Sequence, residues 1–307
     1  MGPITENKKF NPFPGLRPFA PEESDLFFGR STESGEVLEK LLNNRFVTVI
    51  GASGSGKSSL IYCGILPRVR KPDGKETSEW KIISFRPGND PFGNLADAMA
   101  ESVSSSEGNN PGRETFLREL LDNPDGITVA VKKLLAESGG KVLIVADQFE
   151  ELFRYSSLGK SDSTHAMTAK FVDSLVNSVG QASVNVFTIV TMRSDFIGEC
   201  AHYQGLTQLI NNSNYLVPHM GTENDREAIV GPVNYAGARI DPKLVDLLLS
   251  DIGDRTDQLP VLQHAMMRTW DHWQELDESD KPIDKTDYDS VGTKSDAISL
   301  HANESYE

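Results

Sequence analysis

The sequence has little cysteine and no long apolar run. Its 307 residues include only two cysteines, Cys63 and Cys200, and both fall in segments with a helical pattern. Two thiols do not provide a disulfide framework or a cysteine-based metal site, so we interpret them as reduced packing residues. No stretch approaches the roughly 20 apolar residues of a membrane-spanning helix. The N-terminus also lacks the apolar core of a signal peptide. These features predict a cytoplasmic protein.

Basic residues are also few in comparison with acidic ones. Thirty lysines and arginines stand against 45 aspartates and glutamates, which gives a formal net charge of −15. A protein whose main task is to hold DNA or RNA usually carries a basic face, so this composition disfavours nucleic acid as a partner. The contents of 38% hydrophobic and 24% charged residues are ordinary for a globular protein. A chain of this length is expected to form one large and one small domain.

The most informative motif is the stretch GASGSGKS at residues 51–58, which fits G-x-x-x-x-G-K-[ST]. Residues 45–50 before it have the pattern of a buried strand, and residues 58–62 after it have the pattern of a helix. A glycine- and serine-rich loop that merely contains a lysine is the alternative, and this strand–loop–helix context argues against it. The predicted nucleotide-binding residues of the loop are Gly51, Ser53, Gly54, Ser55, Gly56, Lys57, Ser58 and Ser59.

The chemistry of this loop indicates ATP or ADP with Mg²⁺ as the ligand. The glycines let the backbone wrap closely around an anion, so that successive N–H groups point at phosphate oxygens. The helix that follows adds the positive end of its dipole. Lys57 is expected to reach the β- and γ-phosphates, and the Ser58 hydroxyl is expected to bind Mg²⁺.

Strand-like and helical segments alternate along the first two thirds of the chain. The strand-like segments are 45–50, 80–86, 142–146, 184–192 and 214–217. This alternation predicts an α/β fold, a P-loop NTPase with a five-stranded, doubly wound parallel sheet. Residues 31–219 would form this nucleotide-binding domain. Residues 1–30, with four prolines between positions 12 and 21, are predicted to be an arm that packs on it.

From about residue 220 the strand patterns stop. Apolar residues at spacings of three and four predict helices over 223–235, 241–252 and 259–276. We assign residues 220–280 to a small helical domain.

Asp147 directly follows the apolar segment 142–146. An acid in this position can accept from a Mg²⁺-bound water and complete the metal site that Ser58 begins. An acid after an apolar strand is by itself a common strand terminus. Its place downstream of a phosphate loop favours the role at the metal.

The residues after Asp147 bear on catalysis. Many ATPases have a glutamate directly after the metal aspartate, where it polarises the attacking water. This chain has Gln148 instead, which can orient water but cannot take its proton. Glu150 or Glu151 is the candidate base. The alternative is that these two acids simply open the helix at 150–154, where they suit the helix dipole.

Arg193 ends the fourth strand-like segment. In ATPases with an extra strand between the phosphate-loop strand and the metal-aspartate strand, this position faces the γ-phosphate. Arg193 is therefore a candidate sensor of that phosphate through a charge-assisted hydrogen bond. The alternative is an arginine paired with Asp195 on the surface.

Together, these residues resemble the first novel STAND subclass, a prokaryotic, AAA+-related family of signal-transduction ATPases with numerous domains. The resemblance covers residues 10–307 in order. It rests on the segments PGLRPF at 14–19, FFGR at 27–30, the phosphate loop, VADQFEELF at 145–153, TMRSDF at 191–196 and LPVLQH at 259–264. Members of the family often carry repeats or effector enzymes on the same polypeptide.

The resemblance implies a regulatory switch in signalling or defence. ADP would hold the domains closed, ATP would permit homo-oligomerisation of the full-length protein, and hydrolysis would be slow. Phe28, Gly29 and Arg30 would line the adenine pocket, and Pro260 would close over the base. Residues 281–307 would be the start of a truncated winged-helix domain. Sensor or effector domains would follow it.

Two other functions use the same phosphate loop. A DNA-associated helper ATPase of the AAA+ type would be expected to have a basic surface, which this acidic composition does not favour. A small-molecule kinase would need a lid and an acceptor pocket, and the sequence QFEE with a helical domain after it argues against that function.

Overall fold

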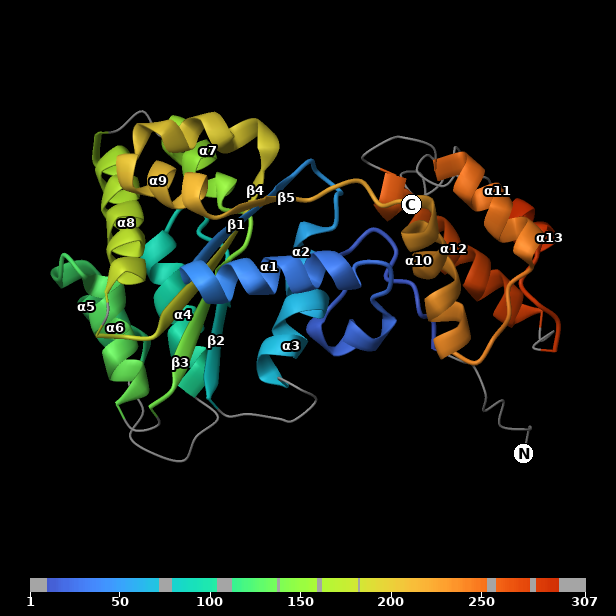
Figure 1. Ribbon diagram of the computed structural model, residues 1–307, viewed down its shortest axis with the longest axis horizontal. Helices are drawn as coiled ribbons and strands as arrows, with labels where there is room; N and C mark the ends of the chain where they lie inside the picture. The colour runs from blue at the N-terminus through green and yellow to red at the C-terminus, as the bar shows by residue number, and fades with distance from the viewer. Residues whose placement is uncertain are drawn as a thin grey trace, which may run out of the picture. The chain divides into compact units, whose positions relative to one another are not determined.

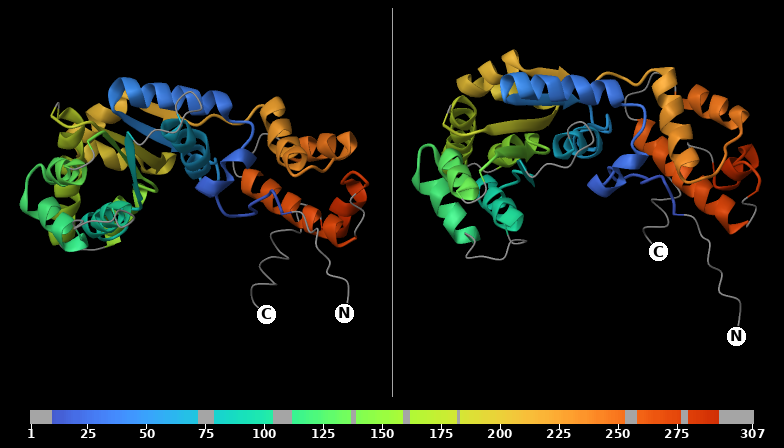
Figure 2. Two further views of the ribbon diagram at one scale, coloured as in Figure 1. Left: turned by 90° about the horizontal axis from the view of Figure 1, so that it is seen from below. Right: turned by 60° about the horizontal axis from the view of Figure 1, so that its bottom comes forward.

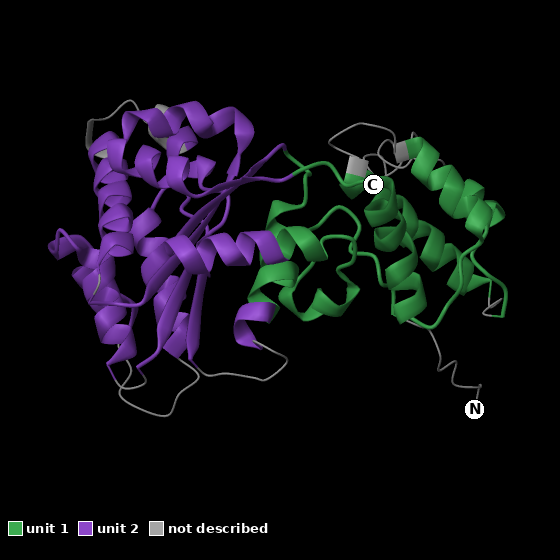
Figure 3. Cartoon of the chain, in the orientation of Figure 1, with its two compact units in different colours: residues 1–34, 53–67, 218–307 green, residues 35–52, 68–217 purple. Residues whose placement is uncertain are grey.

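The computed structural model describes residues 10–71, 79–103, 112–136, 139–158, 162–181, 183–252, 258–276 and 280–292. The chain divides into two compact units, shown in Figure 3. Unit 1 combines three segments that are distant in sequence: Met1–Ser34, Ser53–Pro67 and Pro218–Glu307. Unit 2 contains Gly35–Ala52 and Arg68–Val217. Unit 1 thus holds the N-terminal arm, most of the phosphate loop and the C-terminal helices, while unit 2 holds the sheet.

The sheet of unit 2 has five parallel strands in the order β2-β3-β4-β1-β5 (Figure 1). The strands are β1 (Phe46–Gly51), β2 (Trp80–Phe85), β3 (Lys141–Ala146), β4 (Val186–Arg193) and β5 (Asn214–Leu216). All residues of β1 and all but the first of β3 are buried. Burial on both faces explains why these strands are continuously apolar. The predicted five-stranded parallel sheet is confirmed.

Helices cover both faces of this sheet. Figure 2 shows α1 (Ser31–Asn44) on one face and the helices α4 (Pro91–Val103), α5 (Arg113–Asp122) and α6 (Gly126–Leu135) on the other. The helices α8 (Asp162–Gly180) and α9 (Gln204–Asn212) share one hydrophobic core with α4, α5 and α6. Within this core, Phe171 meets Phe85 and Phe92 edge to face. The prediction of a doubly wound sheet is therefore confirmed.

The C-terminal part of unit 1 is helical. It contains α10 (Thr222–Tyr235), α11 (Pro242–Ile252), α12 (Gln258–Glu275) and the short α13 (Lys285–Ser290). The first three agree with the helices predicted from apolar spacing. Their core includes Trp270 and Trp273, whose ring centroids lie 5.3 Å apart. Ile283 and Tyr288 are buried in the same core.

The assignment of residues 281–307 to a winged helix stays a prediction, because residues 293–307 lie outside the described residues. Within the described residues, no helix is both long enough and apolar enough to cross a bilayer.

The N-terminal arm is ordered by aromatic contacts within unit 1. It includes a 3-10 helix, η1 (Pro21–Leu26). Phe13 is buried in the core of the C-terminal helices, and Phe19 forms a separate small cluster with Leu26 and Cys63. The arm therefore contacts the C-terminal helices and also the helical segment that follows the phosphate loop. The predicted domain boundaries at residues 30, 219 and 280 stay predictions.

Candidate nucleotide-binding site

The phosphate loop is shaped by its glycines. Gly54 has φ of 74° and Gly56 has φ of 84°, in the left-handed region that side chains other than glycine rarely adopt. Helix α2 (Lys57–Ser59) begins directly after Gly56, and the Leu60 N–H donates to the Gly56 carbonyl at 2.8 Å. A π-helix, η2 (Leu60–Ile65), and α3 (Leu66–Arg70) continue the same helical segment. Strand, loop and helix follow one another as the motif predicts.

The polar groups of the loop fit an anionic ligand. The Ser55 hydroxyl is buried, yet its Oγ has no hydrogen-bond partner among the described residues. Such an atom is expensive to bury unless something outside the chain satisfies it. Ser53 is exposed, while Gly54 and the four residues from Ser55 to Ser58 are partly buried. The loop is therefore accessible to a ligand, and Ser55 offers it an unsatisfied hydroxyl.

Ser59 is held differently from the rest of the loop. It is only 8% exposed, and its Oγ accepts a hydrogen bond from the Phe19 backbone N–H at 3.2 Å. Its hydroxyl is thus engaged by the N-terminal arm. The sequence places Ser59 among the nucleotide-binding residues but gives no sign of this bond, since Phe19 lies 40 residues earlier.

In unit 2, Asp147 lies at the carboxyl end of β3 and is 1% exposed. The Thr191 hydroxyl donates to Asp147 Oδ1 at 2.6 Å, and the Gln148 N–H donates to Thr191 Oγ1 at 2.9 Å. Arg86 Nε lies 3.8 Å from Asp147 Oδ2. The Thr191 hydroxyl thus fixes the orientation of a buried carboxylate, and carboxylate oxygens are ligands that Mg²⁺ prefers.

Thr191 and Arg86 were not predicted as site residues. Both lie near the ends of strands adjacent to β3: Thr191 within β4, and Arg86 directly after β2. The carboxyl ends of parallel strands meet at one edge of the sheet, which is where ligands bind in open α/β sheets. A polar residue at the end of a predicted strand is therefore the signal that could have found them, once the strand order is known.

Gln148 has an unusual backbone. Its φ of 56° is left-handed, which costs a residue with a side chain roughly 1 kcal/mol or more. With its amide nitrogen toward Glu151, Gln148 donates to Glu151 Oε1 at 3.0 Å and accepts from Arg86 Nη2 at 3.3 Å. This links Arg86, Gln148 and Glu151 in one row. The left-handed turn is what places the side chain of Gln148 between the other two.

The two candidate bases differ in their surroundings. Glu150 is 5% exposed and opens α7 (Glu150–Leu158), and its Oε2 accepts the Arg193 backbone N–H at 3.3 Å. Glu151 is partly buried and faces the Gln148 amide. Both acids thus stand in the first turn of a helix, where the dipole favours them. A catalytic role for either stays a prediction.

Arg193 ends β4 and pairs in register with Gly51, the first glycine of the phosphate loop. Its guanidinium forms a bidentate pair with Asp195, at 3.1 Å (Nε–Oδ1) and 2.8 Å (Nη2–Oδ2). This hydrogen-bonded pair raises the pKa of Arg193. The guanidinium also lies over the Phe196 ring, 5.7 Å from its centroid. The side chain therefore adopts the surface pair given above as the alternative, and its role as a phosphate sensor stays a prediction.

The three arm residues predicted to line an adenine pocket pack on α10 within unit 1. The Phe28 ring covers Gly231 so closely that a Cβ there would clash with it. Gly29, with φ of 80°, lies against the Asn224 carbonyl. The buried Arg30 pairs with Glu33 at 2.7 Å.

The carboxylate of Asp225 is also buried, and the charge of Arg30 acts on it. Burial raises the pKa of Asp225 in α10, and the charge of Arg30 opposes part of that rise.

Pro260 lies in the first turn of α12, where proline is tolerated, and is partly buried. Roles for Phe28, Gly29, Arg30 and Pro260 at a base stay predictions.

Comparison with known proteins agrees with this fold. A model of the family described as Novel STAND NTPase 1 matches residues 12–307. No curated protein matches the chain. The ORC2 protein of Aeropyrum pernix, solved in ADPNP–ADP complexes, is similar with a TM-score of 0.60 and 12% identity, over 85% of this chain and 67% of that one.

Two further solved structures share the fold. A Walker-type ATPase of Pyrococcus abyssi has a TM-score of 0.58 and 13% identity, over 95% of this chain and 78% of that one. A Drosophila ORC structure bound to DNA has a TM-score of 0.52 and 9% identity, over 95% of this chain and 70% of that one. At these identities the similarity shows a shared fold and no more.

Proposed function

Because the chain belongs to the novel STAND NTPase family, we propose that it is the nucleotide-binding regulatory module of a signalling or defence ATPase. It binds ATP or ADP with Mg²⁺ and alternates between an ADP-bound closed state and an ATP-bound state that oligomerises. The protein is prokaryotic and cytoplasmic, and sensor or effector domains respond to its state. The observation that carries this proposal is the phosphate loop, with Gly54 and Gly56 left-handed ahead of α2.

The residues have distinct roles in this proposal. The loop amides and Lys57 hold the phosphates, while Ser58 and Asp147 hold Mg²⁺. When bound, Mg²⁺ neutralises charge on the phosphate oxygens. Thr191 fixes Asp147 by its 2.6 Å hydrogen bond, so the carboxylate keeps its orientation when the ligand leaves. Arg193 exchanges its partner Asp195 for the γ-phosphate in the ATP state.

Slow hydrolysis follows from the groups near Asp147. Gln148 has no proton-accepting group, and its amide is occupied by Arg86 and Glu151. The carboxylate of Glu150 already accepts the Arg193 N–H. Because Gln148 stands directly after Asp147, no carboxylate occupies that position, and general-base assistance from it is absent. Slow hydrolysis lets the ATP-bound state of a switch persist.

Calorimetry tests the proposal directly. ATP and ADP, each with Mg²⁺, are titrated into the chain, and a melting curve is recorded with and without ADP. A ligand at 100 times its dissociation constant stabilises the folded state by about 2.7 kcal/mol. We expect saturable binding of at least one nucleotide and a matching rise in melting temperature. Absence of binding by both nucleotides would refute the proposal.

A second candidate function is that of a DNA-associated helper ATPase. It is favoured by the similarity in fold to an ORC structure bound to DNA. The net charge of −15 opposes it, since phosphate contacts need a basic surface. Fluorescence anisotropy of a labelled duplex, over a salt series and with each nucleotide, separates the two. Binding that weakens steeply with salt would favour the second candidate.

A further inference from the structure

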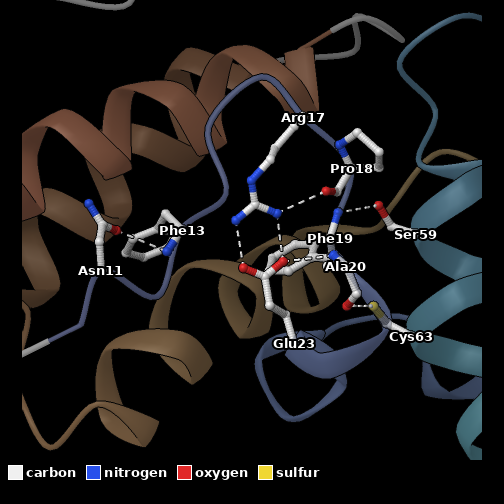
Figure 4. A network of polar contacts seen from close by, with 9 residues as sticks. All are labelled: Asn11, Phe13, Arg17, Pro18, Phe19, Ala20, Glu23, Ser59 and Cys63. Atoms are coloured by element: carbon white, nitrogen blue, oxygen red, sulfur yellow. Dashed lines mark hydrogen bonds and ion pairs between the residues drawn. The ribbon is translucent and has the colours of Figure 1, made fainter.

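The N-terminal arm is attached to the helix of the phosphate loop by two hydrogen bonds, drawn in Figure 4. The Phe19 N–H donates to Ser59 Oγ at 3.2 Å, and the Cys63 thiol donates to the Ala20 carbonyl at 3.1 Å. Phe19 and Cys63 are buried together. Burial raises the pKa of the Cys63 thiol to about 12, so the thiol keeps its proton near neutral pH. Bonds shielded from water in this way are costly to break.

The other end of the arm is attached to α12. The Asn11 amide donates to the Met267 carbonyl at 2.8 Å and to Asp271 Oδ1 at 3.0 Å. The Asn11 Oδ1 accepts the Phe13 N–H at 3.0 Å, which places the Phe13 ring against Trp270 at a centroid distance of 6.5 Å. Asn11 thus fixes the arm to the helix that carries Trp270.

The arm between these two ends is restrained by an ion pair and by prolines. Arg17 donates to both carboxylate oxygens of Glu23 at 2.6 Å, and Glu23 Oε2 also accepts the Ala20 N–H at 2.7 Å (Figure 4). Prolines fix φ at four positions of the arm, which are Pro12, Pro14, Pro18 and Pro21. A segment restrained in this way can transmit a displacement from the loop helix to α12.

The contacted part of the loop helix has an unusual conformation. The Leu66 N–H donates to the Ile61 carbonyl, five residues back, so Leu60–Ile65 is a π-helix. Such segments are rare and are frequently found at functional sites. At Gly64 the helix comes so close to the Ser34 hydroxyl that a Cβ would clash with it. The close approach of Ser34 at Gly64 and the bond from Cys63 to the arm thus both fall within this π-helix.

We propose that the arm couples the phosphate loop to α12, with Ser59 and Asn11 as the positioning residues at its two ends. This inference rests on the proposed function, because a nucleotide at the loop is the signal that the arm passes on. A ligand that displaces α2 also displaces Ser59 and, through their hydrogen bond, Phe19. The restrained segment of the arm then carries the displacement to Asn11 and Phe13. By thermodynamic linkage, if nucleotide binding favours one arrangement of α12 by a given factor, that arrangement raises nucleotide affinity by the same factor.

The first test needs no nucleotide. Amide hydrogen exchange is measured over residues 57–65 in the wild-type chain, in Asn11→Ala and in Asn44→Ala. Asn44 is a matched control, because its amide also donates to a helix carbonyl, that of Lys40, but within its own helix. We expect Asn11→Ala to accelerate exchange at 57–65 roughly fivefold, the factor for about one net hydrogen bond, and Asn44→Ala to leave it unchanged. Equal exchange in all three chains would overturn the coupling.

The second test uses nucleotide. In a Trp80→Phe background, the remaining tryptophans, Trp270 and Trp273, both lie in the core of the C-terminal helices. Their fluorescence is followed during ADP titration, with binding measured separately by calorimetry. We expect Asn11→Ala and Ser59→Ala each to reduce the ADP-induced change at saturation at least twofold. The double variant should show little further loss of the fluorescence change, because both substitutions interrupt the same chain of contacts.

A conservative substitution at Ser59 and the calorimetric binding data distinguish failure of the coupling from failure of the proposed function. Ser59→Thr keeps the hydroxyl and should restore the fluorescence change that Ser59→Ala loses. Undiminished fluorescence changes in saturated Asn11→Ala and Ser59→Ala would refute the coupling while leaving the proposed function intact. A wild-type chain that binds no nucleotide would refute the proposed function, and the exchange experiment would then decide the coupling by itself.

Discussion

The phosphate loop and the carboxyl end of β3 are built in different ways. In the loop the backbone sets the geometry, since Gly54 and Gly56 are left-handed and α2 starts immediately afterwards. At the end of β3 side chains set it, since the Thr191 hydroxyl fixes Asp147 and the Gln148 amide lies between Arg86 and Glu151. A backbone site is specified by local sequence, whereas a side-chain site depends on which strands are neighbours.

The largest expected effect concerns turnover, which depends on the β3 side of this comparison. With Gln148 following Asp147, we expect ATP hydrolysis at roughly one per minute or slower, against about 10 s⁻¹ for a typical enzyme. Steady-state phosphate release by the purified chain measures it, with Lys57→Ala prepared identically to give the background. A rate of several per second would mean that another group near Asp147 acts as an efficient base.

The next prediction tests the loop side. Lys57→Ala removes the cation assigned to the β- and γ-phosphates, and we expect triphosphate affinity to fall at least about 100-fold, or about 2.7 kcal/mol. Calorimetry with ATP measures the loss, and a melting curve without nucleotide checks that the variant is folded. Unchanged affinity in a folded variant would remove Lys57 from the site.

The third prediction tests the side chains at β3. Thr191→Val leaves the buried Asp147 carboxylate without its hydroxyl donor and the Gln148 N–H without its acceptor. We expect a loss of about 2 kcal/mol in the free energy of unfolding, measured with urea. Thr191→Ser should recover most of it.

Thr48→Val is the matched control for this change. Thr48 is a buried strand threonine whose Oγ1 has no hydrogen-bond partner among the described residues. Replacing that hydroxyl by a methyl group should be neutral or slightly stabilising. Equal losses at positions 48 and 191 would show that the hydroxyl of Thr191 contributes nothing beyond packing.

These residues also show what the sequence could predict. The sheet was predicted because strands buried on both faces leave continuous apolar runs, as in 142–146. The loop was predicted because its conformation needs glycine at fixed positions. Thr191 and Arg86 were missed because their proximity to Asp147 depends on the strand order β2-β3-β4. The bond from Phe19 to Ser59 depends in the same way on tertiary structure, since no local pattern joins residues 40 apart.

The smallest expected effect isolates the backbone of the loop. A Cβ at Gly56 would meet no atom within 4 Å, so Gly56→Ala changes only the cost of φ at 84°. That cost is about 1–2 kcal/mol, which should appear as lost stability in urea without nucleotide. Gly198 in η4 (Ser194–His202) also has open space around it but no left-handed φ. There the same substitution should stabilise by about 0.5 kcal/mol, because alanine restricts the unfolded chain. Effects of equal sign at the two glycines would contradict a left-handed Gly56, and with it the contrast between a backbone site and a side-chain site.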